Sequence, residues 1–467
     1  MIVADIFKGQ KVAILGLARS GLSAAKSLIA GGAEIVAWDD DEKNREAARA
    51  ENIPLADLTA IDWTGIRAMV LSPGIPHTLP APHAAVTRAK SAGVKIISDI
   101  YLLMQTRRAA TYVGITGTNG KSTTTSMIAH IIQSAQKPME AGGNLGRAAL
   151  TLEPLGADGY YVLELSSYQL ELIPDCRINV AVFLNLTPDH LDRHGDMDGY
   201  LAAKRNIFNN QQKSDAAIIG VDDEWGEKLF AELSAAQKQK TVAISTSKKL
   251  DRGIYVLDNW LYDGTISRHE KIMDLSALTR LPGIHNWQNI AAGYAAAKYA
   301  GIDRDDIVRG ITDFPGLAHR QQEITTIDGI RFINDSKATN AEAAAKALAC
   351  YRPIYWILGG KPKTDDLDAC VPLYGNVQQA FLIGQAADLF ERLLSPHMPT
   401  KKCETIDRAV EDAFAQAKMD GMRGAVVLLS PACASFDQFR DFEHRGDTFR
   451  DIVLKISHAK SPVGDAA

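Results

Sequence analysis

Short apolar runs alternate with alanine-rich stretches along almost the whole chain. In one such stretch, Leu22, Ala25 and Leu28 recur at helical spacing, so the sequence predicts a helix over Ser20–Ala30. The apolar runs are rich in β-branched residues and predict strands, and regular strand–helix alternation is typical of parallel sheets covered by helices. The predicted strands are Lys11–Leu17, Glu34–Trp38, Ala68–Leu71, Val94–Ile97, Thr111–Thr116, Tyr160–Leu165, Val180–Leu186, Ala216–Val221, Thr241–Ser245, Ile254–Asp263, Arg331–Ile333, Ile354–Leu358, Ala380–Ile383 and Ala425–Leu429.

The predicted strands fall into three blocks, and the second block ends with an alanine-rich helix over Trp287–Ala300. The boundaries between the blocks are predicted at Ser98–Asp99 and at the Pro315–Gly316 turn. A chain of 467 residues is too long for one ordinary core, which favours two or three domains. We therefore predict an α/β protein with three doubly wound domains and mostly parallel sheets, over residues 1–99, 100–315 and 316–467.

Composition narrows the classes of function. A formal net charge of −5 provides no basic surface of the kind that nucleic-acid-binding domains carry, so we expect no nucleic acid partner. No apolar run reaches the length of about 18 residues that predicts a membrane span, and no signal peptide is expected. The five cysteines form no C-x-x-C pair, which suits a reducing compartment. These features predict a cytoplasmic protein, and we expect a monomer.

A glycine-rich turn follows the predicted strand Thr111–Thr116 and opens an amphipathic helix. Such turns cradle phosphates, because backbone N–H groups point inward, the helix dipole favours anions and a lysine neutralises charge. The match to G-x-x-x-x-G-K-S is imperfect, since Gly114 stands one position before the expected glycine. An ordinary glycine-rich strand–turn–helix is the alternative. We favour ATP and a central domain of the phosphate-loop ATPase type, with nucleotide contacts from Gly117, Thr118, Asn119, Gly120, Lys121, Ser122 and Thr123.

The first block carries a weaker nucleotide signal at residues 16–21, where Ala18 replaces the middle glycine of G-x-G-x-x-G. The missing glycine disfavours a nicotinamide dehydrogenase and fits a site for another diphosphate nucleotide better. Carboxylates at the end of the second strand can meet a ribose, and the end of the third strand lies on the same rim. The residues predicted at this site are Gly16, Leu17, Ala18, Arg19, Ser20, Asp39, Asp40 and Gly74.

Several longer motifs follow in order: GTNGKST at 117–123, ELSSYQLE at 164–171, NLTPDHLD at 185–192, HN at 285–286 with Asn289, and NDSK at 334–337. Their order resembles that of the Mur ligases, which add amino acids in peptidoglycan synthesis at the expense of ATP, and the resemblance covers essentially the whole chain. Within that family, SPACASFDQFRDF at 430–442 and the motif at 165–171 are most similar to members that add D-glutamate. The resemblance implies a ligase that joins UDP-N-acetylmuramoyl-L-alanine to D-glutamate through an acyl phosphate.

Three residues of the central block are expected to act beside Lys121. Glu164 closes a strand that ends near Ser122, and the two oxygens suit one Mg²⁺ ion. The resemblance places His190 near a second Mg²⁺ and implies that Lys204 is a carbamylated lysine at that site. Without the resemblance, His190 is an ordinary loop histidine and Lys204 a solvated helix lysine.

The resemblance also assigns binding residues outside the phosphate loop. It implies that Asn289 reaches the adenine and that Arg320, Asp335 and Lys337 contact the nucleotide. Asparagine is common at helix ends, so capping is the alternative for Asn289. Asn144 is expected to meet the sugar–peptide part of the UDP substrate.

The third block is expected to bind D-glutamate. Two carboxylates need cations and hydroxyl donors, with an apolar wall for the carbon chain. The residues that match this pattern in the resembling ligases are Thr339, Lys363, Ser435 and Phe442. Because Lys361 lies two residues before Lys363, the sequence leaves open which of the two meets the side-chain carboxylate of D-glutamate. Taken singly, each of the four matching residues also has an ordinary structural role.

Two other functions stay open at this point. One keeps the chemistry and changes the substrate, as in another Mur ligase or a folylpolyglutamate synthase. The other is a phosphate-loop ATPase that works as a switch, which would hydrolyse ATP without either ligase substrate and form no amide.

Overall fold

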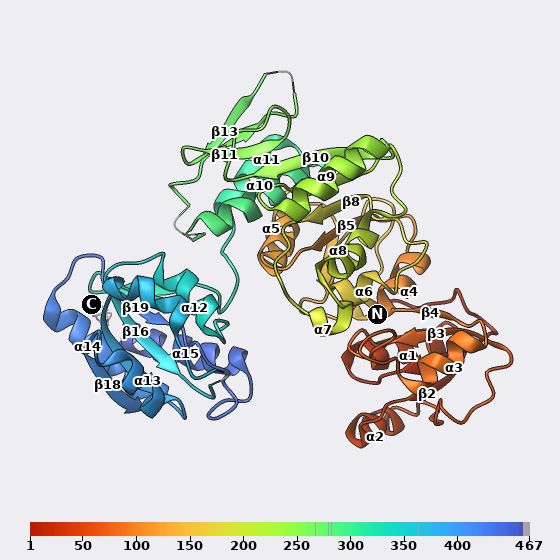
Figure 1. Cartoon of the computed structure of the whole chain (residues 1–467), viewed down its shortest axis with the longest axis horizontal. Helices are drawn as coiled ribbons and strands as arrows, with labels where there is room; N and C mark the ends of the chain where they lie inside the picture. The colour runs from red at the N-terminus through yellow and green to blue at the C-terminus, as the bar shows by residue number, and fades with distance from the viewer. Residues whose placement is uncertain (267, 279, 282, 363, 461–467) are drawn as a thin grey trace, which may run out of the picture. The chain divides into compact units, whose positions relative to one another are not determined.

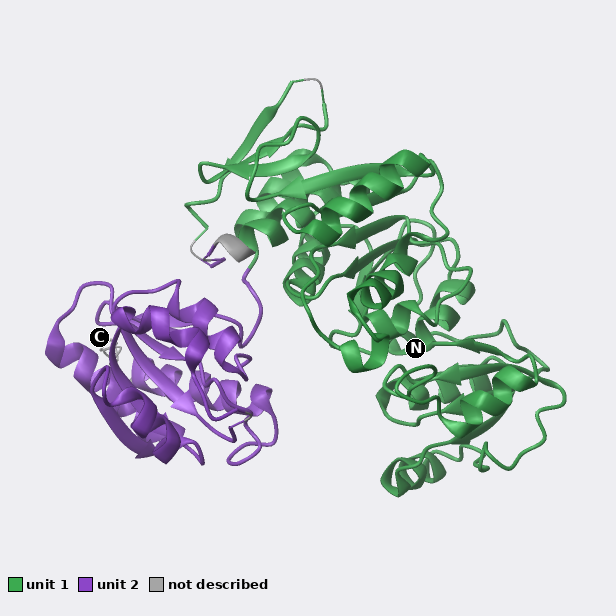
Figure 2. Cartoon of the chain, viewed as in Figure 1, with its two compact units in different colours: residues 1–278, 284–314 green, residues 279–283, 315–467 purple. Residues whose placement is uncertain are grey.

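The computed structural model describes residues 1–460 except 267, 279, 282 and 363. Figure 2 shows that the chain divides into two compact units. The first unit comprises residues 1–278 and 284–314, and the second comprises residues 279–283 and the chain from 315 onward. No helix among the described residues is both long enough and apolar enough to cross a membrane.

The first unit begins with a four-stranded sheet in which all neighbouring strands are parallel, in the order β2-β1-β3-β4 (Figure 1). The strands are β1 (Lys11–Leu15), β2 (Glu34–Trp38), β3 (Ile66–Leu71) and β4 (Lys95–Ile97). Helices α1 (Arg19–Ala30), α2 (Glu42–Ala50) and α3 (Ala84–Ser91) connect them. The order 2-1-3-4 places a reversal of strand order beside β1, where ligands of such sheets bind.

The described part of residues 99–314 holds a nine-stranded sheet in the order β13-β12-β11-β10-β9-β8-β5-β7-β6. Its strands are β5 (Thr111–Thr116), β6 (Met139–Gly143), β7 (Tyr160–Glu164), β8 (Val180–Phe183), β9 (Ala216–Gly220), β10 (Lys240–Ser245), β11 (Ile254–Leu257), β12 (Trp260–Asp263) and β13 (Glu270–Asp274). From β6 to β11 in this sheet order, which includes β5, neighbouring strands pair in parallel. The two other pairings of this sheet, β11–β12 and β12–β13, are antiparallel.

Helices cover this central sheet and supply its site loops. They are α4 (Asp99–Thr106), α5 (Lys121–Ser134), α6 (Ser167–Leu170), α7 (Leu191–His194), α8 (Met197–Arg205), α9 (Glu224–Ala236), α10 (Ile284–Tyr299) and α11 (Arg304–Asp313), with short 3₁₀ turns at Ala149–Thr151 and Asn206–Phe208. One buried apolar cluster includes Ile14 and Leu28 as well as Tyr161 and Phe183, so the first two sheets share a continuous core.

The second unit holds a six-stranded sheet, within its described residues, in the order β14-β15-β19-β16-β17-β18. Its strands are β14 (Gln322–Ile327), β15 (Ile330–Asn334), β16 (Ile354–Gly359), β17 (Val377–Ile383), β18 (Thr400–Glu404) and β19 (Val426–Leu429), and only β14 is antiparallel to its neighbour. Helices α12 (Ala341–Leu348), α13 (Ala387–Leu394), α14 (Ile406–Asp420) and α15 (Phe442–Lys460) and a 3₁₀ segment at Asp368–Asn376 cover it.

Strand β16 shows why this sheet is doubly wound. Trp356 and Leu358 belong to one buried cluster, and Tyr355 and Ile357 belong to another. Side chains alternate between the two faces of a strand, so both faces of the sheet are buried under helices. Together, the three mostly parallel sheets confirm the predicted α/β fold class.

One predicted strand is wrong in detail. Ile254–Asp263 is a hairpin of two strands, β11 and β12, and not a single strand. Asp258 and Asn259 form the turn with φ values of 49° and 64°. A two-residue hairpin turn of type I′ has left-handed backbone at both positions, and Asp and Asn tolerate that conformation best after glycine.

Candidate active site

The predicted phosphate loop connects β5 to α5 at the carboxyl edge of the central sheet. Gly120 caps the helix with φ of 84°, and a Cβ atom there would lie 2.3 Å from Oδ1 of Asn289. The position therefore requires glycine, because a side chain would collide with the helix α10 behind the loop. The turn leads directly into the N-terminus of α5, where the first backbone N–H groups have no partner within the helix, so this end of the helix suits an anion. That the loop binds phosphates stays a prediction.

Asn185, which follows β8, holds the loop in shape. Its Oδ1 accepts from the backbone N of Asn119 at 2.9 Å, and its Nδ2 donates to the Asn119 carbonyl at 3.2 Å. Its own carbonyl accepts from the N–H of Thr118 at 3.0 Å. No role for Asn185 is predicted from the sequence, although the residue begins the NLTPDHLD motif at 185–192.

Two lysines meet at one backbone carbonyl. The Nζ atoms of Lys121 and Lys204 both donate to the carbonyl oxygen of Gly117, at 2.9 and 2.8 Å. Lys121 also donates to the carbonyl of Thr118 at 2.8 Å. The predicted catalytic lysines thus converge on the phosphate loop from α5 and from α8.

Lys204 lies in surroundings that disfavour a positive charge. Its side chain is 1% exposed, which disfavours the charged form, although Nζ also lies 4.6 Å from the ring centroid of Tyr200, whose face attracts a cation. Burial, and then the nearby charge of Lys121, lower the pKa of Lys204 to about 7. The side chain is buried, so the solvated helix lysine that the bare sequence favours is wrong.

Glu164, at the end of β7, presents one uncommitted oxygen. The carboxylate is 3% exposed, and its Oε1 accepts from Nδ2 of Asn144 at 2.8 Å. Its Oε2 is buried and has no hydrogen-bond partner among the described residues. A buried carboxylate oxygen without a donor is costly unless a cation meets it, so this oxygen fits Mg²⁺.

Protein side chains alone do not complete a metal site here. No cluster of three or more histidine, cysteine, aspartate or glutamate side chains suited to a metal occurs within the described part of the chain. Ser122 lies in the first turn of α5, and Ile115 pairs with Glu164 across β5 and β7, so hydroxyl and carboxylate belong to the same edge. Mg²⁺ commonly takes its remaining ligands from phosphates and water.

His190 lies at the start of α7 in the left-handed region, with φ of 53°. Its side chain is 48% exposed, its Nε2 lies 3.4 Å from Oδ2 of Asp189, and its ring centroid lies 5.2 Å from that of Tyr168. An exposed imidazole at the edge that holds the phosphate loop is accessible to a ligand. Its predicted role beside a second metal ion stays a prediction.

Asn289 lies behind the phosphate loop, and its side chain is 3% exposed. Its Oδ1 accepts from Oγ1 of Thr124 at 3.2 Å, and its Nδ2 donates to Oδ1 of Asn286 at 3.2 Å. Because α10 begins at Ile284, Asn289 does not cap the helix. The predicted contact with adenine stays a prediction.

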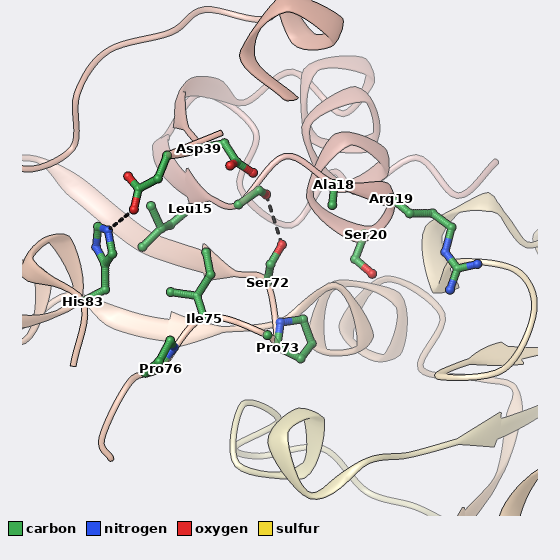
Figure 3. Close-up of a pocket in the computed structure, with 13 residues that line it drawn as sticks. Leu15, Ala18, Arg19, Ser20, Asp39, Ser72, Pro73, Ile75, Pro76 and His83 are labelled. Carbon is green, nitrogen blue, oxygen red and sulfur yellow. Dashed lines mark hydrogen bonds and ion pairs between the residues drawn. The ribbon is translucent and has the colours of Figure 1, made fainter. Parts of the chain in front are cut away.

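A cavity of about 480 Å³ opens at the carboxyl edge of the first sheet (Figure 3). In Figure 3, Ser20 and His83 lie toward opposite ends of the cavity. It is lined by Leu15, Gly16, Ala18, Arg19, Ser20, Asp39, Asp40, Ser72, Pro73, Gly74, Ile75, Pro76 and His83. The structure therefore brings together seven of the eight residues predicted for a diphosphate nucleotide in this block.

The eighth residue, Leu17, does not line this cavity. Its side chain is buried in the core, and its N–H donates to Oδ2 of Asp39 at 2.6 Å. Asn144 does not line it either, and its amide donates to Glu164. Its predicted contact with the sugar–peptide part of the substrate stays a prediction. His83 was not predicted, yet its Nε2 lies 3.0 Å from Oδ2 of Asp40 on the cavity rim.

In the second unit, two loops predicted to bind the amino acid lie side by side. Lys361 and Ala434 exchange backbone hydrogen bonds of 2.9 and 3.0 Å, which joins the loop after β16 to the loop after β19. Ser435 follows directly and is buried. Lys337 Nζ lies 3.7 Å from the ring centroid of Phe442, so these two predicted residues also meet. Thr339 is half-buried, two residues past Lys337, and Lys363 lies outside the described residues.

Asp335 and Arg445 organise the same edge from inside the unit. Asp335 accepts from Oγ of Ser430 at 2.8 Å and from the N–H of Gln321 at 3.1 Å, and burial raises its pKa to about 7. The buried Arg445 donates to the carbonyls of Ser336 and Cys433 at 2.9 and 3.1 Å. Arg445 was missed by the sequence analysis. The predicted nucleotide contacts of Arg320, Asp335 and Lys337 stay predictions.

Known proteins resemble this chain in sequence and in structure. Residues 115–297 match the Mur ligase middle domain, and residues 319–433 match the Mur ligase glutamate ligase domain. The chain is 49% identical to the UDP-N-acetylmuramoylalanine–D-glutamate ligase of Phenylobacterium zucineum, covering 99% of both chains. It is also 49% identical to the ligase of that name from Rhodospirillum rubrum, covering 97% of this chain and 96% of the other.

Solved structures share the fold at low sequence identity. A UDP-N-acetylmuramate–alanine ligase from Thermotoga maritima is 16% identical with a TM-score of 0.57, over 96% of this chain and 100% of the other. A UDP-N-acetylmuramoyl-L-alanyl-D-glutamate–2,6-diaminopimelate ligase is 18% identical with a TM-score of 0.60, over 98% and 94%. With relatives near 49% identity over almost its whole length, the chain belongs to the Mur ligase family.

Proposed function

We propose that this protein is an ATP-dependent ligase that adds D-glutamate to UDP-N-acetylmuramoyl-L-alanine. The observation that carries the proposal is its near-complete match to ligases named for that reaction. The geometry supports it, because a phosphate loop, two converging lysines and a carboxylate with one uncommitted oxygen lie at a single sheet edge. Another Mur ligase specificity and a switch ATPase are less well supported.

In the proposed reaction, a carboxylate oxygen of the substrate attacks the γ-phosphorus of ATP, the bond to the β-phosphate oxygen breaks and ADP leaves. The amine of D-glutamate then attacks the resulting acyl phosphate, and the intermediate collapses to an amide and phosphate as the amine loses a proton. The loop N–H groups and Lys121 hold the phosphates and offset their charge in both steps.

Glu164 and Ser122 would hold Mg²⁺, which supplies positive charge to the phosphates. We propose two Mg²⁺ ions, with His190 near the second. A carbamate on Lys204 forms when the neutral amine adds CO₂ and releases a proton. The change from a cation to an anion removes the repulsion between Lys204 and Lys121 and gives the metal region a further oxygen donor.

We assign the UDP part of the substrate to residues 1–99, ATP to residues 100–315 and D-glutamate to residues 316–467. The cavity at the first sheet supports the first assignment, since a helix N-terminus and Asp39 meet there as in other nucleotide-binding sheets. A nucleotide-linked substrate and ATP are consistent with a cytoplasmic enzyme, and we expect a monomer.

Product analysis tests the function directly. The purified protein is incubated with ATP, Mg²⁺, UDP-N-acetylmuramoyl-L-alanine and one amino acid at a time, and both ADP and amide are measured. We expect one amide per ADP with D-glutamate and little turnover with L-glutamate, L-lysine or meso-diaminopimelate. Preference for another amino acid would change the substrate assignment, and ADP release without amide would favour the switch.

Lys363→Ala is expected to raise the KM for D-glutamate at least about tenfold, with the KM for ATP nearly unchanged. Losing one charge-assisted hydrogen bond costs about 1.5–3 kcal/mol, which corresponds to this change. Lys361→Ala is the matched control, because its backbone bonds to Ala434 do not depend on its side chain. The reverse result would assign the side-chain carboxylate to Lys361, and no effect in either variant would contradict the proposed pocket.

A further inference from the structure

Arg193 connects the cavity of the first sheet to the central sheet. It lies in α7, three residues after His190. Its Nη1 donates to the carbonyl of Gly74 at 3.1 Å, and its Nη2 donates to the carbonyl of Ile75 at 3.5 Å. Both Gly74 and Ile75 line the cavity, and Figure 3 shows the Ile75 side chain among the cavity residues. One guanidinium thus holds the loop that closes the cavity on this side.

The same guanidinium packs on a ring of the central site. Its Cζ lies 4.4 Å from the ring centroid of Tyr168, a cation–π contact. Tyr168 lies in α6, which begins three residues after Glu164, and its ring lies 5.2 Å from that of His190. Arg193 therefore touches the cavity loop on one side and, on the other, the ring that packs beside His190.

A second line of contacts runs parallel to the first. His194 stacks between the rings of Tyr168 and Tyr200, with centroid distances of 5.4 and 5.3 Å. Its Nε2 lies 2.9 Å from Oγ of Ser167, and Tyr200 in turn packs against Lys204. Packed aromatic rings of this kind resist displacement, so the contacts keep α6, α7 and α8 in a fixed arrangement.

We propose that Arg193 is a positioning residue that fixes the distance and register between the UDP-substrate cavity and the phosphate loop. The inference rests on the proposed function. The substrate is held by its uridine end in the cavity, while its carboxylate must come within about 3–3.5 Å of the γ-phosphorus. Any shift of the Gly74–Ile75 loop against α7 moves that carboxylate, although Arg193 touches no reacting atom.

Arg193→Met tests the proposal, because methionine keeps an apolar stem and loses the donors and the charge. A misplacement of about 1 Å costs about a hundredfold in rate, so we expect kcat to fall about 10- to 100-fold. The KM for ATP is expected to stay within about threefold of the wild-type value. The Kd for UDP, measured by calorimetry without ATP, is expected to stay within the same range. Neither constant depends on the register between the cavity and the phosphate loop. Arg193→Lys keeps the charge over Tyr168 and one donor, and is expected to restore part of kcat.

The controls separate this role from general stability. Arg205→Met is the matched control, because Arg205 lies in α8 and pairs with Glu232 at the surface, and its kcat is expected to match wild type. If Arg193→Met fails to fold, Arg193→Lys and Tyr168→Leu carry the test with the same expected split. Unchanged kcat in the variants, or equal losses in kcat, ATP binding and UDP binding, would overturn the inference. Failure of the wild-type protein to form the amide would instead overturn the proposed function.

Discussion

Lys121→Ala is expected to lower kcat for ligation by about a hundredfold to a thousandfold. Its Nζ donates to the carbonyls of Gly117 and Thr118 in the loop that we propose to hold the triphosphate, so we expect it to meet the phosphates when ATP binds. Removing one preorganised donor from the site of developing charge costs about 3–4 kcal/mol in comparable enzymes. The measurement is steady-state ADP release and amide formation at saturating substrates.

The matched control for this variant is Lys213→Ala, which removes an exposed lysine from the same domain before β9. Both variants are expected to unfold near the wild-type temperature, because Lys121 does not belong to the apolar core. A folded Lys121→Ala protein that turned over at a normal rate would show that the loop does not hold the triphosphate.

The strands that the sequence predicts best are those buried on both faces. All six residues of β16 are buried, and in β5 only the first residue is less than fully buried. Central parallel strands read as continuous apolar runs for this reason, so composition alone identifies them. Their carboxyl ends then locate the loops that follow them, which explains why the positions of the glycine-rich turn after β5 and of the residues that line the first-sheet cavity could be predicted.

The strands that could not be predicted from the sequence all lie at the edges of their sheets. They are β6, β13, β14 and β18, and each is the first or the last strand in the order of its sheet. In β18, Thr400–Glu404, only Cys403 is buried, because an edge strand lacks a neighbour on one side and carries polar residues that discourage pairing. Such a segment resembles a loop in its composition, and it forms a strand only because its backbone pairs with the neighbouring strand.

Site residues were missed for a different reason. Asn185 binds Asn119 across 66 residues, and Arg445 binds Ser336 across 109. Neither contact has a local pattern, because the fold alone brings the partners together. Asn144 is predicted to meet the substrate, and its hydrogen bond to Glu164 could not be predicted from the sequence. Residues within a sequence motif can be predicted from one sequence, whereas residues that contact them from a distant segment of the chain cannot.

Lys204→Ala is expected to lower kcat by about a hundredfold or more, and short carboxylates are expected to restore part of it. If the functional group at this position is a carbamate, the variant loses a buried anion and leaves a cavity of matching length. Formate, acetate or propionate can enter that space and return a negative charge. Activity is measured against the concentration of each acid, with thermal unfolding as the check that the variant is folded.

Lys121→Ala provides the control that makes the rescue specific. Both lysines donate to the Gly117 carbonyl, so the two variants remove side chains that meet at one oxygen. Lys121 is expected to act as a cation and Lys204, as its carbamate, as an anion. Burial and the charge of Lys121 lower the pKa of Lys204 to about 7, which favours the neutral amine that adds CO₂. Carboxylates should therefore rescue Lys204→Ala and leave the low activity of Lys121→Ala unchanged. Equal rescue of both variants, or rescue of neither by any short acid, would count against the carbamate, and full activity of unrescued Lys204→Ala would refute it.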